Sequence, residues 1–183
     1  MNKKLIIVTI IFAAITIAAR LLPHMPNVAP MAALALFAGV YLPRRWSIVV
    51  PIAAMLISDL FIGFYEIQVV AAVYLGFALT VMLGWQVAKK LNPLTALGGS
   101  LSGSIIFFML TNAAVWAFTQ MYAPTAAGLM DSYVMALPFF KFSLVGDLAW
   151  TTVFFGAYQV VLRYFPTARF NHEVKLSPLS SRA

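Results

Sequence analysis

Long apolar stretches, separated by short segments that hold most of the charges, constrain this chain more than any other feature. Only 9% of its 183 residues are charged, whereas a soluble domain has about 25% charged residues. A helix of about 20 apolar residues crosses the hydrocarbon core of a lipid bilayer. The sequence therefore predicts an all-α integral membrane protein whose main partner is the lipid bilayer, and it excludes a water-soluble globule.

Six apolar segments follow one another along the sequence, at residues 5–22, 31–42, 46–64, 67–88, 94–122 and 139–165. Five of them have the length of about 20 residues that a membrane-spanning helix needs. The second segment is shorter, and we expect it to extend into its flanking loops or to lie tilted. The pattern predicts six transmembrane helices in one domain over residues 1–165, followed by a polar cytoplasmic tail over residues 166–183.

The basic residues favour one orientation of these segments. With the N-terminus inside and six crossings, all but two of the 12 Lys and Arg residues fall on the cytoplasmic side, the exceptions being Arg20 and Lys141. The cytoplasmic loops of membrane proteins have such an excess of Lys and Arg. We therefore expect a multi-pass protein with both termini in the cytoplasm, and we read the net charge of +7 as a sign of orientation rather than of nucleic-acid binding.

The first segment allows a second interpretation. Asn2, Lys3 and Lys4, followed by apolar residues and the letters IAAR, resemble a secretory signal peptide. Its cleavage would leave five spans with the N-terminus outside. The segment is long for the apolar core of a signal peptide, so we favour a transmembrane helix.

Two carboxylates within the apolar segments are the sharpest functional signals. Asp59 and Asp147 both fall in the predicted outer half of the membrane, and an ionisable group within a span costs several kcal/mol and is a functional candidate by default. Each carboxylate either binds a ligand in a water-accessible pocket or pairs with Arg20 to fix helix packing. We favour the pocket for at least one of them, and Asp59 for that role, because it lies beside an outer loop.

Two further groups of residues fit the same outer site. His24 and Asn27 lie in the proline-rich segment PHMPNVAP, which is either a rigid hairpin or a binding loop that presents both side chains inward. Asn112 and Trp116 are four residues apart and share a helical face, so they would line a pocket for a flat ligand. For Trp116 the alternative is the membrane interface, where tryptophan is common.

Small residues and missing motifs complete the pattern. Gly98–Ser104 and the pair Ala14 and Ala18 would allow neighbouring helices to approach closely.

The chain has no cysteine, a lone histidine is a weak metal signal, and no nucleotide-binding loop or catalytic triad order is present. The sequence therefore predicts no metal, no cofactor and no enzyme, and any ATPase that supplies energy would be another chain.

Four stretches of sequence resemble a known family: RLLPHMPNVAPMAALALFAG, SDLFIGF, TNAAVW and ALPFFKFSLVGDLAWTTVFFG. They resemble a family of small bacterial inner-membrane proteins to which transport is ascribed, and that family is similar to the substrate-binding S components of energy-coupling-factor vitamin transporters. The resemblance covers about residues 20–156. It implies an S-component-like helical bundle with an outer ligand pocket, in which Ala14 and Ala18 dock a transmembrane coupling subunit.

We therefore expect a membrane subunit of an uptake transporter that binds a small molecule resembling a vitamin or a cofactor precursor. The expected ligand-binding residues are Arg20, His24 and Asn27 on the gate side, with Asp59, Asn112, Trp116 and Asp147 as floor and walls. One alternative is a membrane enzyme that uses Asp59 and Asp147, or one of them with His24, as acid and base. The other is a structural or assembly protein without a small ligand.

Overall fold

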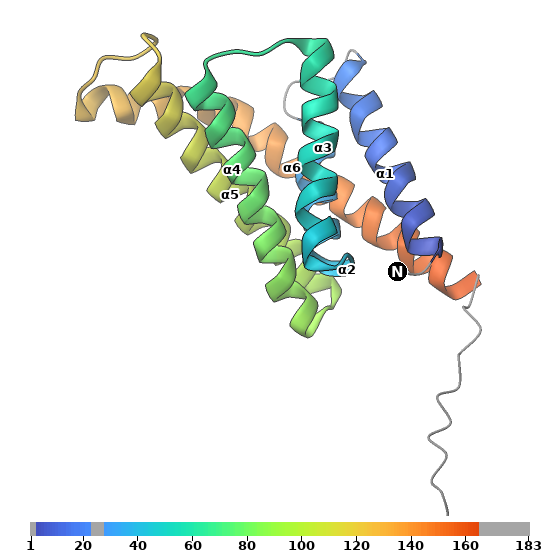
Figure 1. The fold of residues 1–183 in the computed structure, drawn as a ribbon. Coiled ribbons are helices and arrows are strands. Elements are labelled where there is room, and N and C mark those ends of the chain that lie inside the picture. The colour runs from blue at the N-terminus through green and yellow to red at the C-terminus, as the bar shows by residue number, and fades with distance from the viewer. Residues whose placement is uncertain (1–2, 23–27, 165–183) are drawn as a thin grey trace, which may run out of the picture.

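The chain is all-helical in the part that its computed structural model describes, residues 3–22 and 28–164 (Figure 1). The expected tail over residues 166–183 lies outside the described residues, as do His24 and Asn27. In chain order the elements are α1 (Lys3–Leu21), α2 (Met31–Tyr41), α3 (Arg44–Ile62), α4 (Ile67–Val87), the 3-10 turn η1 (Ala88–Lys90), α5 (Pro93–Phe118) and α6 (Ala126–Tyr164).

Five of these helices, namely α1, α3, α4 with η1, α5 and α6, are long and apolar enough to cross a membrane. Helix α2 is apolar but has only 11 residues. At 1.5 Å per residue it is roughly 17 Å long, against a hydrocarbon core of about 30 Å. The prediction of six transmembrane helices is therefore wrong by one. Prolines limit the length of α2. Pro30 caps its start, and Leu42 is extended before Pro43, as residues that precede proline usually are.

The last helix is longer than the sequence pattern predicts. It begins at Ala126 rather than near residue 139 and runs for 39 residues through Pro138. The segment between the fifth and sixth apolar segments of the sequence, which includes Asp131, is thus largely the first part of α6. The hydroxyl of Thr125 accepts a hydrogen bond from the N–H of Gly128 (3.1 Å), which caps the start of this helix.

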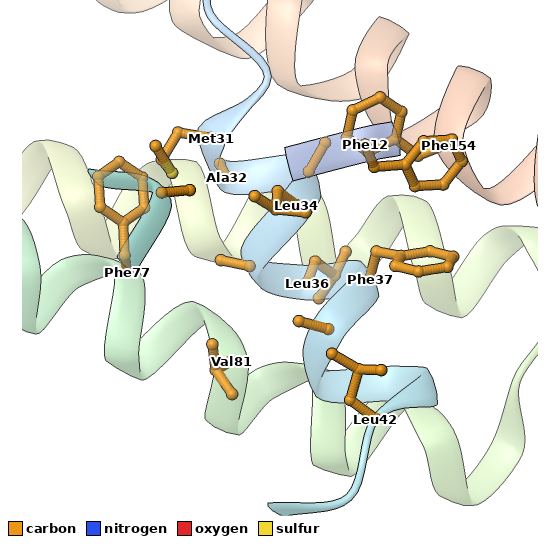
Figure 2. Close-up of a cluster of buried hydrophobic side chains, with 14 of the residues drawn as sticks. Phe12, Met31, Ala32, Leu34, Leu36, Phe37, Leu42, Phe77, Val81 and Phe154 are labelled. Atoms are coloured by element: carbon orange, nitrogen blue, oxygen red, sulfur yellow. The ribbon is translucent and has the colours of Figure 1, made fainter. Parts of the chain in front are cut away.

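The short helix α2 forms the centre of the bundle. Residues 33–38 are 0% exposed, and α2 contacts each of the other five α-helices. Figure 2 shows Leu34, Leu36 and Phe37 of α2 among side chains of α1, α4 and α6. A helix that is apolar on every face is stable only when neighbours cover it completely, so the composition of α2 explains its central position.

Aromatic rings fix the packing of α1 and α6 on α2. The rings of Phe12 and Phe154 are stacked with centroids 4.1 Å apart, and Phe37 meets Phe12 edge-on at 5.0 Å. Such arrangements add to the stabilisation that burial provides.

Glycines bring the helices together on the other side of α2. A methyl group added to Gly84 of α4 would lie 2.7 Å from the Cα of Gly39 of α2, so the two backbones touch where these helices cross. A methyl group on Gly103 of α5 would lie 3.1 Å from Thr80 of α4. The predicted packing role of small residues in the segment 98–104 is confirmed at Gly99 and Gly103, which are both buried against neighbouring helices.

Seven of the nine described Lys and Arg residues lie at one end of the bundle, and the exceptions are Arg20 and Lys141. The start of α1 and the end of α6 lie at the same end, at the bottom of Figure 1, as do the start of α3 and the end of α4. This end has the basic residues Lys3, Lys4, Arg44, Arg45, Lys89, Lys90 and Arg163. The connection between α3 and α4, which includes Glu66, and the start of α6 with Asp131 lie at the other end. The helical ends therefore reproduce the charge separation that the sequence predicts.

Candidate ligand-binding site

A cavity of about 320 Å³, here called the central cavity, lies in the half of the bundle away from the basic end. All six α-helices contribute to its wall. Its lining residues are Arg20, Ala29, Met31, Ala32, Met55, Tyr65, Val73, Phe77, Phe107, Thr111, Ser143 and Asp147. This size and this mixture of an apolar wall with a few polar groups are typical of small-molecule sites.

A salt bridge joins α1 to α3 at the edge of this cavity. The Nη2 atom of Arg20 donates to Oδ1 of Asp59 at 2.8 Å, and Nη1 lies 2.6 Å from Oγ of Ser58 and from Sδ of Met55. The hydroxyl of Tyr74 donates to Oδ2 of Asp59 at 2.9 Å. Both oxygens of Asp59 are thus occupied, and its side chain is 2% exposed. The carboxylate of Asp59 fixes the guanidinium of Arg20, which lines the cavity.

Tyr65, in the connection between α3 and α4, also lines the cavity. Burial raises the pKa of its phenol, and the negative charge of Asp59 raises it further. The hydroxyl of Tyr65 therefore stays neutral at physiological pH and is able both to donate and to accept a hydrogen bond.

Asp147 is the second carboxylate of the site and differs from Asp59 in its surroundings. It lies in the middle of α6, is 8% exposed and lines the central cavity. Its Oδ2 atom accepts a hydrogen bond from the hydroxyl of Ser104 at 2.7 Å. No Lys or Arg of the described residues lies within salt-bridge distance of Asp147.

A second cavity of about 220 Å³, here called the α5–α6 cavity, adjoins the first. The two cavities share Phe107, Thr111, Ser143 and Asp147. Asn112 lines the second cavity, where its Nδ2 atom donates to the carbonyl of Phe108 at 2.8 Å. Asp147 therefore stands at the boundary of two adjacent hollows and faces both.

Residues beside Asp147 position the chain that enters α2. A methyl group added to Gly146 would lie 3.0 Å from the Cα of Val28, so the backbone at Val28 packs directly on α6. One turn further on, the indole N–H of Trp150 donates to the carbonyl of Val28 at 2.8 Å. These two contacts place the start of α2 against the segment of α6 that presents Asp147.

The structure brings four of the predicted site residues together. Arg20 and Asp147 line the central cavity, Asp59 is bonded to Arg20, and Asn112 lines the adjoining cavity. Trp116 is not among the residues that line these two cavities, and its indole N–H donates to the carbonyl of Ala123 at 3.0 Å. His24 and Asn27 lie outside the described residues.

The preference for Asp59 as the carboxylate that faces the pocket is corrected by the geometry. Asp59 is the member of the buried ion pair, and Asp147 lines the cavity. The physical reason is the direction of the side chains: Asp59 points to α1 and α4, where Arg20 and Tyr74 satisfy it. Closeness to an outer loop in the sequence does not reveal this direction.

Sequence reasoning missed two polar residues that orient the site. The sequence pattern predicts only a packing role for Ser104, which is also the hydrogen-bond donor to Asp147. Tyr74 was not singled out, although it bonds to Asp59. The available signal was a hydroxyl within an apolar span, but many such hydroxyls bond to their own helix, as Thr16 does to the carbonyl of Phe12 (2.7 Å).

The residues expected to dock a partner lie on the surface of α1. Ala14 and Ala18 are both exposed. Ala14 borders a shallow apolar groove between α1 and α3 of about 330 Å³. A small-residue face of this kind permits another helix to approach closely.

The described part of the chain contains no group of three or more His, Cys, Asp or Glu side chains that could hold a metal ion. Neither a curated protein nor a solved structure matches the chain. A family model described as a family of unknown function, DUF6580, matches residues 1–168. With nearly its whole length matched, the chain belongs to this family of unknown function.

Proposed function

We propose that this chain is the substrate-binding membrane subunit of a small-molecule uptake transporter. The observation that carries the proposal is the central cavity, which places the charged groups of Arg20 and Asp147 together inside an apolar helical bundle. Charged side chains are costly at membrane depth and usually mark substrate or ion pathways. A bundle that needed no ligand would be expected to fill such a space with apolar side chains.

The charge distribution supports binding from the outer face. We place the chain in a bacterial inner membrane, with the basic end of the bundle facing the cytoplasm. The central cavity then lies in the outer half, beneath the connection between α3 and α4. Although α2 is too short to cross, it returns the chain towards the basic end (Figure 1), which is consistent with two cytoplasmic termini.

The resemblance to S components supports partners for the transport step. The exposed residues Ala14 and Ala18 would dock a transmembrane coupling subunit, to which ATPases attach on the cytoplasmic side. The substrate would be a molecule of the size of a vitamin or a cofactor precursor.

The geometry lends less support to a membrane enzyme that uses two aspartates. Acid and base groups must both reach the substrate. The oxygens of Asp59 are occupied by Arg20 and Tyr74, and Asp59 is not among the residues that line the cavity.

Filling the cavity tests the proposal. Ser143 lines both cavities, so Ser143→Trp should occupy the space that a substrate needs. Val145 is 68% exposed on the same helix, and Val145→Trp is the matched control. Native mass spectrometry of gently purified protein should detect a bound small molecule in the wild type and in Val145→Trp but not in Ser143→Trp. An unchanged adduct in Ser143→Trp, or no adduct in any form, would contradict the proposal.

A further inference from the structure

We infer that the molecule bound in the central cavity is an organic cation whose charged nitrogen pairs with Asp147. The inference rests on the proposed substrate-binding function and adds the chemical class of the substrate. It is carried by the charges, the hydrogen-bonding groups and the aromatic rings that line the cavity.

The charges of the cavity do not cancel. Arg20 lines the wall, but its charge is compensated by Asp59 at 2.8 Å. Asp147 has the hydroxyl of Ser104 as its partner and no cation within salt-bridge distance among the described residues. The nearest basic residue in the sequence of α6, Lys141, is exposed, and its Nζ atom lies 5.0 Å from the centre of the Phe142 ring. Among the described residues, the cavity therefore has one carboxyl group, that of Asp147, without a basic partner.

A buried carboxylate without a counter-charge is unfavourable, and a cation that enters the site removes this cost. An anionic substrate would instead meet the repulsion of Asp147, while its natural partner Arg20 is already held by Asp59. The electrostatics of the site thus favour a cation over an anion of the same shape.

The hydroxyl groups on the wall are oriented to accept hydrogen bonds. Thr111 donates its hydroxyl hydrogen to the carbonyl of Phe107 at 2.8 Å, and Ser143 donates to the carbonyl of Phe139 at 3.4 Å. Because each hydroxyl has a single hydrogen, both oxygens have lone pairs left for a donor in the cavity. An ammonium or amidinium group has several N–H donors and fits such a wall.

Two aromatic rings provide a surface for the rest of the molecule. The rings of Phe77 and Phe107 both line the cavity, with centroids 4.9 Å apart. A ring face attracts a nearby cation, and the same rings bury the apolar body of an organic amine. These groups, with Met31 and Met55 beside them, indicate an amine with an apolar or aromatic skeleton rather than a bare metal ion.

The test uses three probes of one shape and different charge. Benzylamine is a cation at pH 7, benzyl alcohol is neutral and benzoate is an anion. Each is titrated against the purified full-length chain in detergent, and the saturable rise in melting temperature gives its affinity. Asp147→Asn removes the carboxylate, and Asp131→Asn, on an exposed part of the same helix, is the matched control. Asp147→Glu keeps the charge and serves as a second variant if the amide does not fold.

We expect the wild type and Asp131→Asn to bind benzylamine about 10- to 100-fold more tightly than benzyl alcohol, the ratio that a charged hydrogen bond provides. This preference should disappear in Asp147→Asn and persist in Asp147→Glu. Equal binding of benzyl alcohol or benzoate, or an unchanged preference in Asp147→Asn, would overturn the inference. The inference would also be overturned if sodium chloride raised the melting temperature through Asp147 while benzylamine had no effect.

The same data separate this inference from the proposed function. If benzyl alcohol or benzoate binds as tightly as benzylamine and Ser143→Trp abolishes that binding, the site takes small molecules but does not select cations. If no probe stabilises the wild type and no small molecule co-purifies with it, both the inference and the proposed function are refuted.

Discussion

Replacing Asp59 by asparagine should destabilise the protein because it leaves the charge of Arg20 without its partner. The amide has nearly the shape of the carboxylate, and its oxygen can still accept one of the two hydrogen bonds that Asp59 accepts from Arg20 and Tyr74. The main loss of stability is therefore electrostatic. Breaking a buried ion pair by removing one partner costs about 3–5 kcal/mol. The side chain of Arg20 is 15% exposed and lines the central cavity, so it is not fully enclosed. We therefore expect a loss of stability of about 3 kcal/mol, at the lower end of this range.

The assay is the free energy of unfolding in mixed micelles, measured by titration with dodecyl sulfate and followed by circular dichroism. A double variant, Arg20→Met with Asp59→Asn, has no stranded charge and should recover at least half of the loss. Asp131→Asn removes an exposed carboxylate and should change stability by less than about 0.5 kcal/mol. The reasoning is refuted if Asp59→Asn loses less than about 1 kcal/mol, or if the double variant is no more stable than the single one.

Three further predictions address packing, docking and orientation. Gly84→Ala should cost about 1–3 kcal/mol by overpacking the crossing of α2 and α4, whereas Gly98→Ala, with no atom within 4 Å of the added carbon, should be neutral or stabilising by up to about 1 kcal/mol; equal unfolding free energies of the two variants would contradict this. Ala14→Leu or Ala18→Leu should reduce uptake by cells without lowering the melting temperature of the purified protein, and normal uptake would rule out the docking role. A reporter fused after Ala183 should be active in the cytoplasm, and a periplasmic signal would refute the proposed orientation.

The local features of this chain follow from its sequence. Uninterrupted apolar runs predict long helices, and four of the five spanning helices begin and end within a few residues of the predicted limits. The capping box of Asn92 and Thr95 at the start of α5 and the extended Leu42 before Pro43 are local effects of the same kind. The basic residues at one end are likewise visible in the sequence. The apolar pattern places the start of the last helix near residue 139, whereas the helix begins at Ala126 and continues through Pro138, a residue type that breaks most helices.

The candidate site could be predicted only as a set of residues. The sequence indicated that Arg20, Asp59 and Asp147 lie in the same half of the molecule. It left open which carboxylate pairs with Arg20. The rotation of each helix about its own axis sets where its side chains point, and the sequence alone does not fix that rotation. The same limit hid the bond of Ser104 to Asp147, which joins residues 43 positions apart.

Only the tertiary structure decided these pairings and the position of α2. Hydrophobicity marks α2 as a helix that must be covered, but the contact of Gly39 with Gly84 and the stacking of Phe12 on Phe154 set how the other helices cross it. Those crossings turn Asp59 towards Arg20 and Tyr74, and they leave Asp147 facing the cavity. Periodicity along one helix determines what that helix buries, whereas contacts between helices determine which buried charges meet.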